Sequence, residues 1–357
     1  MPQNLPLEIS LEISPKSRFD MTDITRLAMD HIDGKIGMYR KATYSSFHTT
    51  AGYLEQSLCS RLKHNQDRIA SYIRAFKHIF PINADYLHDK MELRSELSES
   101  QKKVEPKNAD SHLTFIGSGL RNNVTYDNQP DMPVYFIDLD GVSEHGVRNR
   151  KTNILYFNAE ETVFEDQIDV PVSRHPVDSV NLRDPRLGYL DKLNHLLQEF
   201  EVEKGRVEIS LDPSEKHAGL TVNEYETLLM THDLIDVLRN PMEFMGEKGK
   251  YILSNPHTIP RRTREYAKYD FVQVFNELMD AFRITESVVE KLLSKFFALP
   301  AEKFLRLKRS VSLPFSNIED GKPAKIVEGT YQSPILLQWQ NTTDNTRKLH
   351  LKITRYN

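Results

Sequence analysis

The sequence of 357 residues (41.5 kDa) is long for one hydrophobic core and predicts two domains, since domains usually hold about 100 to 200 residues. With 39% hydrophobic residues, 27% charged residues and a mean hydropathy of -0.54, the composition is that of a water-soluble globular protein and argues against intrinsic disorder. A net charge of -4 and a pI near 6.4 exclude a general attraction for nucleic acid or anionic membrane, so small metabolites are the expected ligands.

The cysteine content and the N-terminus indicate the compartment. Cys59 is the single cysteine and has no partner for an internal disulfide, as expected in a reducing compartment. Residues 1–6 carry no leader pattern, and no apolar run approaches the roughly 18 residues that span a bilayer. We therefore expect a cytoplasmic protein.

In chain order, the first half predicts strands and amphipathic helices. Apolar and polar residues alternate strictly at 7–14 and predict a strand with one buried face. A second strand, at 36–44, leads into a polar elbow at 46–52, Ser-Phe-His-Thr-Thr-Ala-Gly. Apolar residues at helical spacing then predict helices at 53–62 and 69–79.

The middle of the chain holds a long polar loop and a proline-rich segment. Residues 95–110 are charged and almost free of aliphatic side chains, which predicts an exposed loop, and loops of this length are often functional. Strands at 134–141 and 153–157 follow. Prolines and charges without periodicity predict a linker at 161–187, so we expect the first domain at 1–160.

The second half, 188–357, repeats the order of strand, elbow and helix. Residues 206–211 alternate as a strand. They lead to an elbow at 217–224, His-Ala-Gly-Leu-Thr-Val-Asn-Glu, and to an amphipathic helix at 225–238. A helical insertion is predicted around 240–300, before the closing strands.

The two elbows look like diverged copies of one another, which predicts a tandem duplication. In both, a strand meets small polar residues and then a helix, so that backbone and side-chain donors gather at a helix N-terminus. Such an elbow suits an anionic ligand.

Taken in order, these motifs resemble the YjbQ family, the secondary thiamine-phosphate synthases. In the first half the resemblance lies in His-Thr-Thr-Ala-Gly at 48–52, Tyr-x-His-Asp at 86–89, Asn-Ala-x-x-His-Leu at 108–113, and Asp140-Gly141 followed by Arg148 and Arg150. In the second half it lies in the elbow at 218–224 and in Gly-Thr-Tyr-Gln at 329–332. The family consists of small trimeric α+β proteins with thiamine-phosphate synthase activity. The resemblance therefore implies an α+β fold of two tandem YjbQ-like domains, each with a mixed or antiparallel sheet and packed helices, and a homo-oligomer.

The halves depart from the family pattern in complementary ways. The family's Asn-Glu after the elbow is kept at 223–224, but the first half has Gln-Ser at 56–57. The elbow histidine is His48 in the first half, whereas Glu215 stands near its place in the second. We therefore expect a composite site to which both halves contribute.

The candidate site residues are imidazoles, carboxylates and small polar side chains. Imidazoles with a nearby carboxylate can bind a divalent metal, Mg or Zn, or move protons, although a histidine beside a strand is often structural. The resemblance implies catalytic roles for His48, His88, Asp89, His112, Glu224 and Gln332, with His88, Asp89 and His112 as metal ligands. It implies substrate contacts from Thr49, Thr50, Asn108, Asn223 and Thr330.

Three functions stay open at this point. The first is a metal-assisted transferase of the family's type, which joins a pyrimidine diphosphate to a thiazole phosphate, releases diphosphate, and needs phosphate charge neutralised. The second is a hydrolase that acts on another phosphorylated metabolite with the same histidines and carboxylates. The third is a non-catalytic binding or scaffold protein. A phosphorylated small molecule and further copies of the chain are the expected partners, and nucleic acid and membrane are not.

Overall fold

The protein has an α+β fold, as the sequence predicts. The computed structural model describes residues 5–31, 35–129, 131–225, 229–239, 244, 307–317 and 323–357. The helical insertion predicted around 240–300 lies almost wholly outside these residues. None of the helices in the described ranges is long and apolar enough to cross a membrane.

The first half is built on two antiparallel sheets with helices packed against them. Its elements are β1 (Leu7–Ile13), β2 (Asp20–Asp23), α1 (Ile24–Met29), η1 (Lys35–Met38), β3 (Lys41–Ser46), β4 (Ala51–Gly52), α2 (Gln56–Arg61), α3 (Gln66–Ile79), η2 (Met91–Leu93), α4 (Glu99–Lys102), α5 (Ala109–Ser118), β5 (Asn123–Asp127), β6 (Tyr135–Asp138), β7 (Val142–Ser143), β8 (Gly146–Val147) and β9 (Arg150–Phe157). The larger sheet has the order β1-β9-β3-β5 and the smaller one β2-β6-β4, with β7 and β8 as a separate hairpin.

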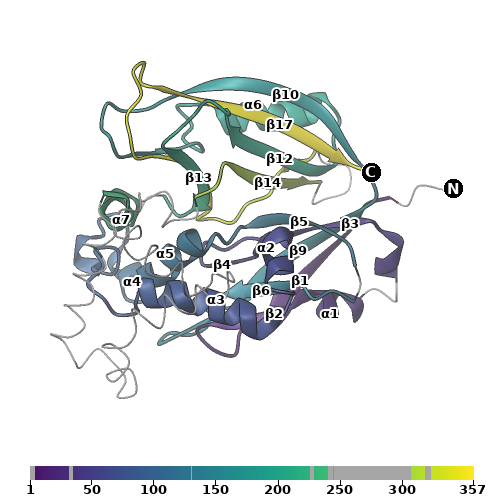
Figure 1. Cartoon of the computed structure of the whole chain (residues 1–357), viewed down its shortest axis with the longest axis horizontal. Helices are drawn as coiled ribbons and strands as arrows, with labels where there is room; N and C mark the ends of the chain where they lie inside the picture. The colour runs from purple at the N-terminus through teal and green to yellow at the C-terminus, as the bar shows by residue number, and fades with distance from the viewer. Residues whose placement is uncertain are drawn as a thin grey trace, which may run out of the picture.

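The second half is also built on a larger and a smaller antiparallel sheet. Its elements are β10 (Glu160–Pro171), β11 (Asp178–Asn181), α6 (Tyr189–Glu199), β12 (Lys204–Leu211), β13 (Ala218–Asn223), the π-helical turn η3 (Leu229–Asp233), α7 (Leu234–Arg239), β14 (Ser310–Ser316), β15 (Lys325–Ile326), β16 (Ser333–Gln338) and β17 (Thr346–Tyr356). The sheet orders are β10-β17-β12-β14-β15 and β11-β16-β13. Figure 1 shows β10, β17, β12 and β14 above the first-half strands β3, β5 and β9.

The two halves share one strand order. In chain order, β1, β3, β5 and β9 take the same places in the first larger sheet that β10, β12, β14 and β17 take in the second. The smaller sheets match as well: β4 pairs with β6 through Ala51 and Asp138, and β13 pairs with β16 through Ala218 and Gln338. The two elbows therefore occupy equivalent places in the topology. The duplication hypothesis requires this equivalence, and common descent of the halves stays a prediction.

The core of the first half includes residues from the second. Met230 and Leu234, in η3 and α7, are fully buried in the same cluster as Tyr86, and the Phe244 ring lies 6.3 Å from that of Tyr86. Burying a leucine or methionine side chain stabilises a fold by about 1.5–3 kcal/mol. This packing fixes the end of η3 beside the loop that follows α3.

The strand predicted at 36–44 begins later than expected. Residues 35–38 form the 3-10 helix η1, and β3 pairs with β9 and β5 only from Lys41 onward. The side-chain amide of Asn128 donates to the carbonyls of Ile36 and Tyr39, at 2.7 and 2.8 Å. The side chain of Asn128 thus supplies hydrogen-bond donors to two carbonyls of this turn. Because Asn128 is distant in the sequence, the local pattern at 36–44 does not reveal the turn.

The segment predicted as a linker, 161–187, instead carries most of β10 and all of β11. β10 pairs with β17 along almost its whole length, and its solvent-facing charges pair across the strands, as Glu165 does with Lys352 and Glu161 with Arg355. Val170 is the one buried residue of β10, and a register shift between Thr162 and Phe164 interrupts the strand, so its apolar residues follow no regular period and the strand was missed.

Candidate metal centre

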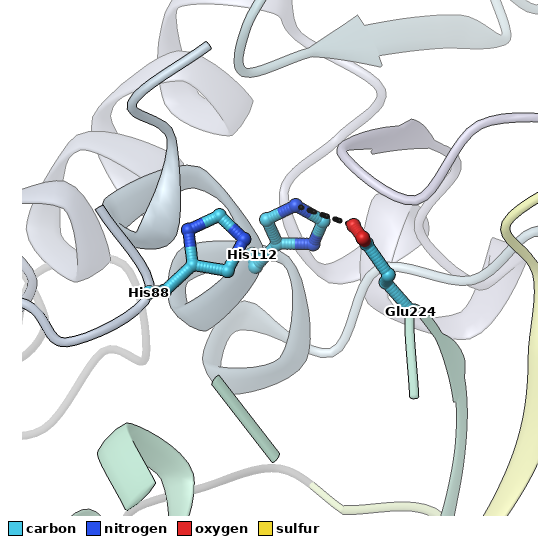
Figure 2. A group of neighbouring side chains, drawn as sticks. All are labelled: His88, His112 and Glu224. Atoms are coloured by element: carbon cyan, nitrogen blue, oxygen red, sulfur yellow. Dashed lines mark ion pairs between the residues drawn. The ribbon is translucent and has the colours of Figure 1, made fainter. Parts of the chain in front are cut away.

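Two buried histidines and a glutamate meet where the halves join (Figure 2). His88 lies in the loop after α3, His112 lies on α5, and Glu224 directly follows β13. Their ligand atoms all lie within 4.8 Å of one another, and His112 Nε2 is 3.6 Å from Glu224 Oε2. The side chains of His88, His112 and Glu224 are 0%, 1% and 15% exposed. The cluster is therefore enclosed.

Asp89 ties the two histidine segments together. Its Oδ1 accepts the N–H of Ala109 at 3.1 Å, at the start of α5, where a carboxylate is favoured by the helix dipole. The same oxygen accepts the Nδ1 proton of His88 at 2.9 Å. Asp89, predicted as a metal ligand, thus lies behind His88 and orients its ring, as carboxylates commonly do for metal-bound histidines.

The hydrogen bonds of His112 fix its tautomer. Asn223 Oδ1 accepts the Glu224 N–H at 2.8 Å, and Asn223 Nδ2 donates to the Thr49 carbonyl at 3.2 Å, so the orientation of this amide is determined. The contact of 2.7 Å between Asn223 Oδ1 and His112 Nδ1 therefore requires the proton on Nδ1. The Nε2 lone pair of His112 then faces Glu224.

His88 presents its Nε2 atom in the same way. Because Nδ1 donates to Asp89, Nε2 carries the lone pair, and this buried atom has no hydrogen-bond partner among the described residues. Leaving a buried acceptor unsatisfied costs about 1–3 kcal/mol. A cation bound between Nε2 of His88 and Nε2 of His112 would satisfy it.

The donor set fits zinc. Two imidazole nitrogens and a carboxylate oxygen are ligands that Zn²⁺ takes at about 2.0–2.2 Å, which puts neighbouring ligand atoms about 3.3 Å apart in a tetrahedron. The observed separations, up to 4.8 Å, would have to close by roughly 1.5 Å at most. Three protein ligands leave a fourth position for water or substrate.

Burial sets the protonation states. It lowers the pKa of both histidines to about 3, with Arg94 contributing at His88 and the His88 ring contributing at His112. It raises the pKa of Glu224 to about 7, while Arg94 opposes the rise and Glu105 adds to it. Near neutral pH both imidazoles are therefore neutral, and Glu224 exchanges a proton.

Arg94 supports Glu224 from the segment before α5. Its guanidinium is 1% exposed and contacts Glu96 at 2.6 Å, Glu105 at 3.4 Å and Glu224 at 3.5 Å. One cation thus faces three carboxylates, and a divalent cation would balance the group. Sequence reasoning missed Arg94, because its partner Glu224 lies 130 positions away in the other half.

His48 lies apart from the cluster of His88, His112 and Glu224. Its side-chain Nε2 accepts the backbone N–H of Lys151 at 2.9 Å and so links the elbow to β9. Thr50 is buried and its carbonyl accepts the N–H of Leu139. The first elbow therefore contributes backbone structure to the site.

Gln332 of the second half holds the same elbow. Its Nε2 donates to the carbonyls of Ser46 at 2.9 Å and His48 at 3.1 Å, and its Oε1 accepts the Gly329 N–H. Thr330, predicted to contact substrate, is exposed, and its carbonyl accepts from Arg183. Gln332 thus docks the second half onto the elbow.

Asn108 belongs to a charged group beside α5. It donates to Asp140 Oδ2 at 2.8 Å, and the fully buried Asp140 also pairs with Arg18 at 3.4 Å and with Arg148. The Arg148 side chain is 36% exposed. Burial is the main cause of the lowered pKa of His112, and the charge of Arg148 adds a smaller decrease.

The fold and the cluster define an α+β protein with a two-histidine, one-carboxylate centre shared by two halves of matching strand order. No protein-family model and no curated protein matches the chain. Among solved structures, the chain is similar to a YbjQ-like protein of unknown function from Sulfolobus solfataricus P2, with 16% identity, a TM-score of 0.28, and coverage of 55% of this chain and 99% of that one. It is also similar to a hypothetical protein from Aeropyrum pernix K1, with 13% identity, a TM-score of 0.27, and coverage of 54% of this chain and 98% of that one. An uncharacterized conserved protein of the YjbQ/UPF0047 family from Clostridium acetobutylicum gives 14% identity, a TM-score of 0.26, and coverage of 53% of this chain and 98% of that one.

Proposed function

We propose that this chain is a metal-dependent enzyme that acts on a phosphorylated small molecule at a composite site of His88, His112 and Glu224. The observation that carries the proposal is the convergence of two histidines, each with its Nε2 lone pair fixed by a partner on Nδ1, on a carboxylate from the other half. Zinc bound there would act as a Lewis acid and lower the pKa of a bound water.

The chain's own residues supply the rest of the proposed site. Asp89 and Asn223 hold the Nδ1 protons of the two histidines, and Arg94 orients Glu224. Arg148 is the cation that would bind a phosphate group. Asp140 already holds one side of its guanidinium, and the side chain is partly exposed, so its remaining N–H groups are accessible to a ligand. A substrate held between the cluster and Arg148 would be neutralised at both ends.

The first candidate reaction is transfer of the thiamine-phosphate synthase type, in which a pyrimidine diphosphate and a thiazole phosphate give thiamine phosphate and diphosphate. Its support is the resemblance of the site motifs and the presence of Arg148, which pairs with Asp140 and whose charge lowers the pKa of His112. The second candidate is hydrolysis of a phosphate ester. The proposed ligand set favours it, because three protein ligands leave a fourth position for a water molecule whose pKa a bound zinc would lower.

Metal and ligand binding by matched variants test the proposal. His112→Ala and Glu224→Ala should each lower affinity for zinc and for phosphometabolites at least about tenfold, roughly 1.4 kcal/mol, measured at a temperature at which circular dichroism shows each variant to be folded. His350→Ala is the control, since His350 pairs with Asp212 on the second half, is 42% exposed, and should bind zinc as wild type does.

The pattern of losses separates the possible outcomes. Loss in both variants supports a composite site. Loss in His112→Ala with wild-type binding in Glu224→Ala would place the site in the first half alone. Zinc binding that neither substitution changes would end the proposal of a metal centre, and zinc binding without turnover of any phosphorylated compound would favour a binding protein.

A further inference from the structure

A buried carboxylate of the second half holds the backbone of His88. Asp233, at the end of η3, is 1% exposed. Its Oδ1 accepts the Leu87 N–H at 3.1 Å and its Oδ2 accepts the His88 N–H at 2.9 Å. These two N–H groups lie in a loop without strand or helix pairing, so Asp233 supplies the acceptors that regular structure would otherwise provide.

The carboxylate is itself fixed by packing. Met230 and Leu234 lie in the same buried cluster as Tyr86, which immediately precedes Leu87. η3 therefore cannot shift without disturbing the first-half core. Hydrogen bonds from backbone N–H groups to a charged acceptor are among the stronger ones in proteins.

We propose that Asp233 is a positioning residue for His88, through which the second half sets the direction of the Nε2 atom. The inference rests on the proposed metal centre. Asp89 fixes the ring of His88 from the side of Nδ1, whereas Asp233 fixes the backbone that carries the ring. With Asn223 on His112, the second half positions both histidines as well as supplying Glu224.

Docking of the second half and metal affinity are then linked. The first half contributes two histidines whose Nε2 atoms converge only while Asp233 and Asn223 are in place. Weakening either contact should lower metal affinity without removing a ligand atom, because binding must then also order the loop.

The test compares Asp233→Ala and Asp233→Asn with a matched control, Asp178→Ala. Asp178 also accepts two backbone N–H groups, from Ser173 and Ser179, both at 2.8 Å. It lies at the end of β11 that pairs with Gln338, whereas Asn223 pairs with Ser333 at the other end of β16. The control therefore removes an equivalent contact away from the cluster.

Two readouts are measured on the full chain. Amide hydrogen exchange of the metal-free protein should rise at least about tenfold at residues 87 and 88 in Asp233→Ala, less in Asp233→Asn, which keeps one acceptor oxygen, and not at all in Asp178→Ala. Titration with Co²⁺ should give at least about tenfold weaker binding and an altered visible spectrum in Asp233→Ala, with wild-type values in Asp178→Ala.

Each result decides a separate step. Wild-type exchange at residues 87 and 88 in Asp233→Ala would overturn the positioning role. Faster exchange with wild-type cobalt affinity and spectrum would overturn its link to the metal centre. If the wild-type chain binds no cobalt, the proposed function is wrong, and so is the role of Asp233 at a metal centre. Hydrogen exchange would still show whether Asp233 holds the loop. Should Asp233→Ala not fold, Asp233→Asn carries the same comparison.

Discussion

The affinity of the cluster for Zn²⁺ should rise about tenfold from pH 6 to pH 8, and Glu224→Gln should remove this dependence. Burial raises the pKa of Glu224 to about 7, so binding below that pH must first displace a proton from the carboxyl. Burial lowers the pKa of His88 and His112 to about 3, so both imidazoles offer lone pairs throughout the range. The sign follows directly: affinity is lost as the pH falls through the pKa of Glu224.

The magnitude comes from the ionised fraction of Glu224. A carboxyl with a pKa of about 7 is about one-tenth ionised at pH 6 and about nine-tenths ionised at pH 8, a tenfold ratio equal to about 1.4 kcal/mol. Two histidines with ordinary pKa values of about 6.5 would instead change the affinity by about sixteenfold over the same range. The wild type alone does not separate these cases, but Glu224→Gln does, because only ordinary histidines would still titrate in that variant.

Competition against a chromophoric chelator, in buffers that do not bind zinc, measures the affinity at each pH. His350→Ala should follow the wild-type curve, since its imidazole lies outside the cluster. Glu224→Gln should bind more weakly at pH 8 and change little on going to pH 6. A variant that still loses more than about fivefold between these values would refute the argument that both histidines are held neutral by burial.

The chemistry of the site could be predicted from the sequence better than its geometry. His88, His112 and Glu224 were identified by motif order and do meet. Motifs identify side chains capable of coordination, but which atom faces which partner depends on the folded chain. Asp89 illustrates the difference, because its orienting role requires the N–H of Ala109 as well as His88.

The supporting residues were not predictable from local patterns. Arg94 reaches Glu224 across 130 positions of sequence, and Asp233 reaches His88 across 145. Neither belongs to a motif, and an isolated Arg or Asp in a polar stretch is usually solvated. Both residues are buried, and each one contacts a residue of the other half.

The same distinction holds for the fold. Strict alternation at β1 and β12 allowed both strands to be predicted, because each has one buried face. α5 gave no amphipathic signal, since all ten of its residues are buried and a helix surrounded by protein has no polar stripe. β10 gave little signal because Val170 is its one buried residue and a register shift between Thr162 and Phe164 interrupts the alternation.

Two further predictions concern stability. Gly329→Ala should destabilise the fold by about 2 kcal/mol in thermal denaturation, because the new Cβ would lie 2.0 Å from the Phe47 carbonyl oxygen, whereas the exposed neighbour Thr330→Ala should stay within about 0.5 kcal/mol; equal stability of both variants would contradict the close docking. The other prediction concerns acid sensitivity of the metal-free protein. The pKa of His112 is lowered by burial from about 6.5 in the unfolded chain to about 3, so its contribution to stability is present above the unfolded value and is lost as the pH falls towards the folded one. Between pH 6.5 and pH 5 this loss amounts to about 1.5 kcal/mol, because His112 takes up a proton in the unfolded state but stays neutral in the folded state. His112→Gln should therefore lose about 1.5 kcal/mol less than wild type between these pH values in urea titrations, whatever its stability at pH 6.5, and an unchanged loss would mean that His112 is not held neutral in the folded protein.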